Sequence, residues 1–511
     1  MTMNNPIVAM DTAMDTAMAM AQDMDIMKNN KIPYLIALSP ILFLITLLTT
    51  NVFMYDNTMA GPNQLALLFS GALAAIVGIS YGKKWQNILY GIENSIKSIV
   101  PAIIMLLLIG SLAGTWLISG VIPTMIYYGL QLLNPTIFLF ATAIITAIVS
   151  LATGSSWSTI ATVGIALLGI GTAIGLPLGL IGGAIISGAY FGDKMSPLSE
   201  TTNMAAAISG VDLFEHIKYM MYTTIPSFLI TLILFLAIGF YFNPSISSEQ
   251  MNQALNIIAT KFTITPWLFI VPILVIAMIA KKVSAIPVLF TGVLLGGVFA
   301  IIFQPEIVLE VSGRSMNNIS SNYIGILNAM IGEINFTEIN TSINDIFNIK
   351  EADRSSLLKS GGMLGMFNTL LLMFCAMTFS GSIESTGLLK RIGEPIIKYA
   401  HNTGSLIATT VSTCLFINIT TSDQYMSIVV PGRMFADTYK EKGLSAKNLS
   451  RTLEDSGTVT SVLIPWNSCG AIQSTVLGVS TLIYAPYCFF NIISPIMTMV
   501  FAYFNIKIKK I

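Results

Sequence analysis

Charged residues are scarce in this chain. Only 10% of its 511 residues are Asp, Glu, Lys or Arg, whereas 54% are hydrophobic, and the mean hydropathy is +0.76. A water-soluble domain of this size needs far more charge to cover its surface. The shortage excludes a soluble globular protein and predicts a chain whose main solvent is the lipid bilayer.

Neither a basic excess nor a metal-binding pattern is present. Lys and Arg together number 25, as do Asp and Glu, so the chain lacks the surplus positive charge on which nucleic-acid binding draws. It has two histidines, and its four cysteines show no C-x-x-C spacing; they are Cys375, Cys414, Cys469 and Cys488. We interpret the cysteines as buried thiols and expect no cofactor and no nucleic-acid partner.

The first residues lack the features of a signal peptide. Met1–Met27 is a low-complexity run of Met, Ala and Asp without a basic start or a continuous apolar core. We expect residues 1–32 to form a mobile cytoplasmic tail, of which residues 1–27 can be removed without loss of transport.

Long apolar segments recur along the rest of the chain. A helix of roughly 20 apolar residues spans a bilayer, and the sequence predicts about ten such helices. Shorter pieces between them are interrupted by Gly, Pro, Ser and Thr; we interpret these as discontinuous or re-entrant helices, which survive at membrane depth only inside protein or beside a wet cavity. The windows are 33–53, 64–81, 99–119, 135–153, 222–242, 266–281, 283–303, 361–381, 405–420 and 484–504; the interrupted pieces are 159–170, 177–191 and 457–480; a polar loop is expected at 304–360.

Basic residues cluster at particular helix ends. Lys83 and Lys84 follow the second window, and Lys390 and Arg391 follow the eighth. Because basic residues near helix ends stay in the cytoplasm, we place these ends and both termini there. Loops 54–63 and 304–360 are then expected outside.

The two halves of the chain look related. The windows pair as 99–119 with 361–381 and 222–242 with 484–504, at one common shift in residue number. The charge bias gives the paired windows opposite orientations. The sequence therefore predicts an all-α polytopic membrane protein made of two inverted-topology repeats, 33–245 and 246–511, the second including the loop at 304–360. Secondary transporters of this architecture bind their cargo where discontinuous helices meet.

Each predicted repeat contains a hydroxyl-rich helix break followed by an acidic, hydroxyl-rich hairpin. The breaks are 152–159 and 418–425, and the hairpins are 192–203 and 453–461, the latter followed by 465–468. The same shift that pairs the apolar windows places Asp193 on Asp455. We therefore expect these two aspartates to occupy equivalent positions.

The polar residue types in these regions suit a small hard cation. Carboxylates, hydroxyls, amides and freed backbone carbonyls are all oxygen ligands. A carboxylate is expensive at membrane depth and burial raises its pKa toward neutrality, so one group can hold either a proton or a metal ion. Competition for one site would give cation/proton exchange, whereas open helix N-termini would favour an anionic group on a substrate. The predicted site contains Asp193, Asp455, Asp423, Ser155, Ser156, Thr159, Ser196, Ser199, Glu200, Thr202, Asn203, Thr421, Ser422, Ser456, Thr458 and Asn467.

Structural interpretations compete with this one. Glu200 and Asn203 are also consistent with helix capping, and Glu454 is as consistent with a surface position as with a site. The basic stretch 433–451, which ends at Arg451, is typical of a solvated cytoplasmic face. Single Ser and Thr residues in membrane helices more often serve packing than binding.

An intramembrane aspartyl protease is a competing function of another class. It would use Asp193 and Asp455 as a catalytic dyad. Its Gly-x-Gly-Asp signature is absent, since Tyr190-Phe-Gly precedes Asp193, and neither H-E-x-x-H nor G-x-S-x-G is present. We therefore do not expect an enzyme.

Four runs resemble the NhaC family of Na+/H+ antiporters. They are Gly188–Asn203 (GAYFGDKMSPLSETTN), Asp423–Arg433 (DQYMSIVVPGR), Asn448–Ser461 (NLSRTLEDSGTVTS) and Ile464–Ser468 (IPWNS). The likeness extends over about residues 33–506, and only the Met-rich tail and the polar stretch 304–360 depart from it.

The resemblance implies an ion-transporter-type fold in the bacterial cytoplasmic membrane and, in some members, proton-driven Na+ extrusion. Asp193 and Asp455 would then bind the transported Na+. Other members exchange malate for lactate or move amino acids. We therefore predict a Na+/H+ antiporter that works by alternating access, with a Na+- or H+-coupled exchanger of a small carboxylate or amino acid as the alternative. The oligomeric state, including a homodimer, also stays open.

Overall fold

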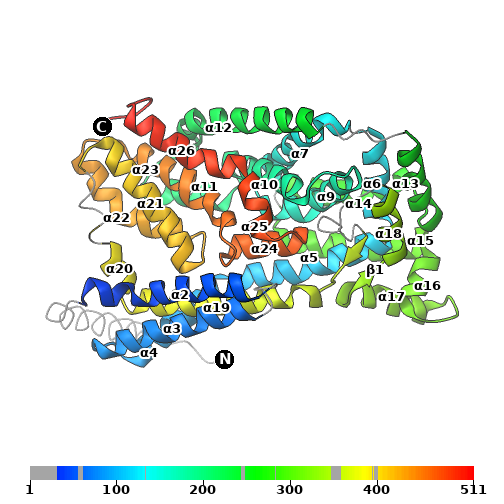
Figure 1. Cartoon of the computed structure of the whole chain (residues 1–511), viewed down its shortest axis with the longest axis horizontal. Coiled ribbons are helices and arrows are strands. Elements are labelled where there is room, and N and C mark those ends of the chain that lie inside the picture. The colour runs from blue at the N-terminus through cyan, green and yellow to red at the C-terminus, as the bar shows by residue number, and fades with distance from the viewer. Residues whose placement is uncertain are drawn as a thin grey trace, which may run out of the picture.

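The computed structural model describes residues 32–55, 61–132, 134–242, 248–281, 283–346, 358–393, 395 and 401–511. Its one sheet in this part of the chain is an antiparallel pair of short strands, β1 (Ile334–Asn335) and β2 (Lys359–Ser360). Among the described residues, nine helices are long and apolar enough to cross a membrane, or up to eleven if each of two bent pairs is one span. The predicted all-α polytopic class is confirmed (Figure 1).

The first half supplies α2 to α12, and its apolar helices coincide with the predicted windows. The elements are α2 (Tyr34–Met54), α3 (Pro62–Ser80), α4 (Trp85–Ser98), α5 (Val100–Ile118), α6 (Val121–Leu132), η1 (Pro135–Ile137), α7 (Phe138–Thr153), α8 (Ser156–Thr159), the π-helical turn η2 (Ile160–Gly164), α9 (Ile165–Ala173), α10 (Leu178–Met195), α11 (Glu200–Ser209) and α12 (Leu213–Phe242).

The second half supplies the remaining elements. They are α13 (Ser248–Lys261), η3 (Pro266–Phe269), α14 (Ile270–Ala280), α15 (Ala285–Phe303), α16 (Pro305–Ser312), α17 (Ile319–Ile331), α18 (Thr337–Ile346), η5 (Leu364–Met366), α19 (Phe367–Ser385), α20 (Leu388–Gly393), α21 (Thr403–Thr421), α22 (Met426–Glu441), α23 (Ala446–Leu453), the π-helical turn η7 (Glu454–Thr458), η8 (Ser461–Leu463), α24 (Ser468–Leu477), α25 (Thr481–Tyr484), η9 (Ala485–Tyr487) and α26 (Phe489–Tyr503).

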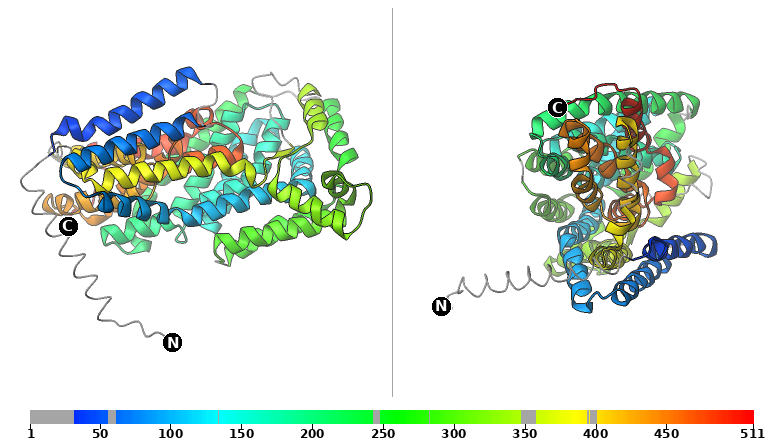
Figure 2. Two further views of the ribbon diagram at one scale, coloured as in Figure 1. Left: turned by 90° about the horizontal axis from the view of Figure 1, so that it is seen from below. Right: turned by 90° about the vertical axis from the view of Figure 1, so that its left-hand side faces the viewer.

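The two halves interlock. Helix α19 of the second half packs against α3 and α4 of the first, and α15 packs against α5. Figures 1 and 2 show α2, α3 and α19 side by side. The predicted division into 33–245 and 246–511 therefore does not correspond to two separate bodies.

The later parts of the two halves repeat one series of elements in one register. Helices α9 and α22 end at Ala173 and Glu441, α10 and α23 begin at Leu178 and Ala446, and α12 and α25 begin at Leu213 and Thr481. Helices α11 and α24 end before left-handed Gly210 and Gly478. All four pairs have the same separation along the chain, and we call this alignment the structural register.

The structural register corrects the one predicted from the apolar windows. Apolar segments match one another in many registers, whereas cap and turn residues fit only one. In the structural register Asp193 aligns with Ser461, and Asp455 aligns with Ser187. The two aspartates are therefore not equivalent, and the inverted orientation of the repeats stays a prediction.

Helix α10 is continuous, so the predicted interruption within 177–191 is wrong. Its glycines allow close packing on α7 instead of breaking the helix. A Cβ on Gly188 would lie 2.1 Å from the carbonyl oxygen of Ala143, and one on Gly192 would lie 2.2 Å from that of Ala147. Small residues at four-residue spacing let two membrane helices touch through their backbones, which fixes the position of the neighbouring Asp193.

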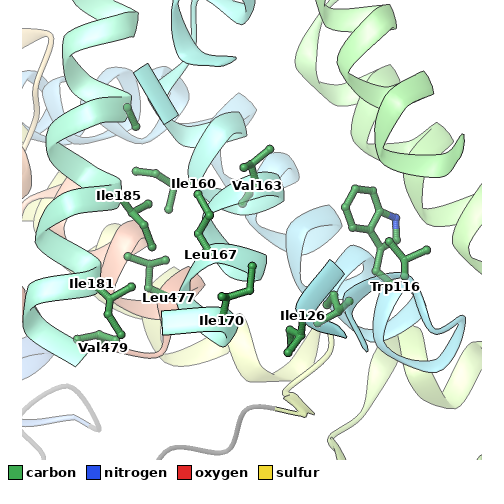
Figure 3. Packing of buried hydrophobic residues seen from close by; sticks show 14 of the residues in the cluster. Trp116, Ile126, Ile160, Val163, Leu167, Ile170, Ile181, Ile185, Leu477 and Val479 are labelled. Carbon is green, nitrogen blue, oxygen red and sulfur yellow. The ribbon is translucent and has the colours of Figure 1, made fainter. Parts of the chain in front are cut away.

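Elements α8, η2 and α9 form one continuous helix, Ser156–Ala173, so the interruption predicted within 159–170 is only a π-helical turn. Apolar packing holds this helix in place. Figure 3 shows Ile160, Leu167 and Ile170 from this segment beside Ile181 and Ile185 of α10. All five side chains are buried. The polar break before α8 therefore rests on a rigid apolar support.

The stretch 304–360 is not an irregular loop. It contains α16, α17, β1 and α18, with Ile307 and Val308 buried in the main core. The predicted tail at 1–31, part of loop 54–63 (residues 56–60) and the segment 347–357 lie outside the described residues.

Labelling of single cysteines tests the predicted topology. A Cys at Ser320, an exposed position on α17, should react with a membrane-impermeant maleimide added outside cells, because 304–360 is expected there. A Cys at Lys84, exposed beside α4, should react only after the cells are opened, since basic residues at helix ends stay inside. The opposite pattern would contradict the predicted orientation.

Candidate functional site

Both halves contain the same kind of helix break. Helix α7 ends at left-handed Gly154 (φ 67°), and the Ser155 side chain caps α8 by accepting a hydrogen bond from the Ser158 N–H at 3.2 Å. Helix α21 ends at left-handed Ser422 (φ 59°), and Asp423 accepts from the Met426 N–H at 3.0 Å. The two breaks align in the structural register. A non-glycine residue at positive φ is costly and is common at functional sites.

Two matching turns follow the breaks. The Ser199 side chain caps α11, and the Asn467 side chain caps α24 by accepting from the Cys469 N–H at 3.1 Å. Each cap follows a proline by two residues, at Pro197 and Pro465. Helices α11 and α24 therefore begin at equivalent positions in the structural register.

The breaks and turns meet at one cavity of about 990 Å³. Matched positions of the two halves line it in pairs: Ser155 with Asp423, Trp157 with Tyr425, and Glu200 with Ser468. The rest of the wall includes apolar residues of α5, α14 and α15, among them Met105, Ile279 and Ala285. The cavity thus lies where the two repeats come together.

The cavity lining carries acidic but no basic side chains among the described residues. Asp193, Glu200 and Asp423 are its carboxylates. Asp193 is 7% and Asp423 4% exposed, whereas Glu200 is exposed and accepts from the Tyr425 hydroxyl at 2.7 Å. This lining makes a negative concavity that attracts cations and repels anions.

Asp193 is held in place by the first helix break. One of its carboxylate oxygens, Oδ2, accepts hydrogen bonds from the Ser156 N–H at 3.0 Å and from the Ser156 hydroxyl at 2.7 Å. The contact joins the end of α10 to the start of α8. Asp193 therefore connects the first helix break to the end of α10.

The predicted residues divide between cavity and scaffold. The lining contains Asp193, Asp423, Ser155, Ser199, Glu200 and Asn203. The following predicted residues do not line it: Ser156, Thr159, Ser196, Thr202, Thr421, Ser422, Asp455, Ser456, Thr458 and Asn467.

Several of the hydroxyls stabilise helix ends. Thr159, Thr421 and Ser456 each donate to a carbonyl oxygen four residues earlier, at 2.9, 2.9 and 2.5 Å. The Ser196 hydroxyl accepts from the Leu198 N–H at 3.2 Å, and the Thr202 hydroxyl donates to the Lys194 carbonyl at 3.0 Å. These hydroxyls therefore serve helix capping and packing, which is the competing structural interpretation of such residues.

Asp455 lies in a closed cluster outside the cavity. It forms an ion pair with Lys194, and both side chains are fully buried. Its other oxygen accepts from the hydroxyls of Thr223, at 2.7 Å, and Thr498. In this conformation the charge of Asp455 is balanced by Lys194, so no charge is left for a transported ion.

Sequence reasoning misses several buried polar residues. Lys194, Glu454 and Arg451 are all 0% exposed, so the solvated face predicted up to Arg451 is wrong at that residue. Arg451 instead lies over the Tyr219 ring, 4.6 Å from its centroid. The sequence does contain a signal for Lys194. It lies at the end of an apolar, glycine-rich helix, and a basic residue buried there must find an acidic partner.

Comparisons with known proteins cover nearly the whole chain. The model of the Na+/H+ antiporter family matches residues 188–506. The Na+/H+ antiporter NhaC of Bacillus subtilis is 34% identical, over 93% of this chain and 98% of that protein. The malate-2H+/Na+-lactate antiporter of the same organism is 34% identical, over 93% and 96%. The arginine/ornithine antiporter ArcD of Halobacterium salinarum is 33% identical, over 91% of each.

These relatives are transporters and not enzymes, and the apolar helices of this chain suit the same membrane setting. The chain is a multi-pass cell-membrane protein and a secondary active antiporter. It belongs to the Na+/H+ antiporter family.

Proposed function

We propose that this antiporter exchanges Na+ for protons by alternating access, with the cation bound in the cavity by Asp193 and Asp423. The cavity lining is the observation that carries the proposal. Paired positions of the two repeats meet there, and its acidic groups are three carboxylates without a basic partner among the described lining residues. The proposed mechanism needs no cofactor, and the cavity is complete within one chain, so a homodimer is not required for it.

The chemistry of the lining supports a hard cation. Na+ prefers oxygen ligands, and the lining offers carboxylates, the hydroxyls of Ser155 and Ser199, and the amide of Gln424. Discontinuous helices at a repeat interface supply further backbone oxygens. A negative lining raises the local cation concentration before binding.

A cationic amino acid is the second candidate cargo. The cavity of about 990 Å³ lies at the upper end of the volumes that hold organic ligands, and ArcD is among the relatives. A dicarboxylate such as malate fits less well, because it would face three carboxylates without a basic group in the described lining.

Transport in proteoliposomes tests the proposal. An inward Na+ gradient should drive protons out, as reported by an internal pH dye, while arginine and malate should neither drive proton movement nor exchange with labelled internal solute. Arginine counterflow without Na+-driven proton movement would establish the second candidate instead. Malate counterflow alone would contradict the argument from the acidic lining.

A further inference from the structure

Glu454 is a fully buried carboxyl beside the cavity but not in it. It begins the π-helical turn η7 and is 0% exposed. Its Oε1 accepts hydrogen bonds from the hydroxyls of Thr201, at 3.1 Å, and Thr202, at 3.5 Å. Its Oε2 has no hydrogen-bond partner among the described residues. π-Helical turns are rare and occur frequently at functional sites.

Among the described residues, no basic group forms an ion pair or a hydrogen bond with Glu454. Lys194 bonds to Asp455 and to the Ser494 hydroxyl at 3.0 Å, and Arg451 lies over Tyr219. The neighbouring elements include these buried charged or titratable groups: Asp193 and Lys194 on α10, His216 and Tyr219 on α12, Cys414 on α21, Tyr439 on α22, and Arg451 and Asp455 next to the turn itself; Glu200 on α11 is exposed.

An unpaired carboxylate that is fully buried is strongly disfavoured. Burial therefore favours the neutral, protonated form of Glu454 in this conformation.

Two hydroxyls connect Glu454 to the cavity. Ser199 and Thr201 both line the cavity, and their side-chain oxygens are 3.1 Å apart. Thr201 in turn donates to Glu454. Thr201 is 5% exposed, so this short chain leads from the solvent-accessible space to a carboxyl that solvent does not reach directly.

We propose that Glu454 is the proton-carrying residue of the antiporter, separate from the cation-binding carboxylates Asp193 and Asp423. The inference rests on the proposed Na+/H+ exchange. To load ionised Glu454, a hydronium ion in the cavity gives its excess proton to Ser199 and becomes neutral water, Ser199 gives its own proton to Thr201, and Thr201 gives its own to Oε1. Both hydroxyls end neutral, and unloading runs the same transfers in reverse.

This arrangement differs from the competition of proton and cation for one site that the sequence suggests. With two sites, cation binding and proton binding can be removed separately. The Glu454→Gln substitution keeps the shape of the neutral acid but cannot release a proton. Thr201→Val removes the connecting hydroxyl, and Thr201→Ser keeps it.

The experiment measures two activities of each variant in proteoliposomes. Glu454→Gln should lose Na+ movement driven by a pH gradient but keep counterflow of labelled Na+ against unlabelled Na+ at equal pH. Thr201→Val should slow the pH-driven activity, and Thr201→Ser should rescue it. Glu441→Gln, at the exposed end of α22, is the control and should leave both activities unchanged.

The outcomes separate this inference from the proposed function. If wild-type protein moves no Na+ in either assay, the proposed function fails. If wild-type protein exchanges Na+ for protons and Glu454→Gln does so at the same rate, the inference is overturned and competition at the cavity explains the coupling. Loss of Na+ counterflow in a correctly inserted Glu454→Gln protein would also overturn it. If that variant does not insert, equal pH-driven rates for Thr201→Val and Thr201→Ser would overturn it.

Discussion

Replacing Asp193 or Asp423 by Asn should abolish Na+-driven proton movement while leaving an inserted protein. Both carboxylates are nearly buried in the cavity wall. Asn keeps the shape and one oxygen but removes the charge that balances a bound cation. A unit charge 4 Å from the ion contributes about 4 kcal/mol at an effective dielectric constant of 20, which corresponds to a roughly thousandfold loss of cation affinity.

The measurement is Na+-driven proton movement in proteoliposomes containing equal amounts of wild-type and variant protein. Glu441→Gln on α22 is the matched control, because that carboxylate is exposed and outside the lining. It should retain wild-type exchange. Wild-type rates in both Asp→Asn variants would show that the cation binds elsewhere.

The helices could be predicted from the sequence because membrane spans need long apolar segments. The helix breaks could also be predicted, since Gly, Ser, Thr and Asp gather there between long apolar segments. The register between the repeats that the apolar windows predict is wrong, because apolar segments match one another in many registers. The signal for the structural register lies in residues with a backbone constraint: left-handed Gly175 aligns with Gly443 and left-handed Gly210 with Gly478, at one common separation.

The buried charges could not be placed from the sequence. Lys194 and Asp455 are 261 residues apart in the chain, and only packing brings them together. The burial of Glu454 could not be predicted from the sequence either. Next to Asp455 in sequence it looks like part of a surface acidic pair, whereas the π-helical turn buries both carboxyls. Charge alone therefore predicts solvent exposure at positions where the fold buries the side chain.

Removing one partner of the Lys194–Asp455 pair should destabilise the protein far more than removing both. Asp455→Asn leaves a buried ammonium without an anion, and Lys194→Met leaves a buried carboxylate without a cation. Breaking one side of a buried pair typically costs about 3 to 5 kcal/mol. The double variant Lys194→Met/Asp455→Asn has no unpaired charge, so it should recover most of the loss.

Unfolding of the purified variants in detergent measures this cycle. The exposed pair Lys261–Glu310, at 2.7 Å, supplies the control: Lys261→Met should cost less than about 1 kcal/mol, because solvent screens both charges. The cycle also separates the two roles considered for Asp455. One outcome is that Asp455→Asn is as stable as wild type but loses exchange, and that the double variant has the same stability as Asp455→Asn. Asp455 is then the cation ligand that the sequence predicts. If stability falls and the double variant restores it, Asp455 serves to neutralise Lys194, and the cation charge is balanced by Asp193 and Asp423.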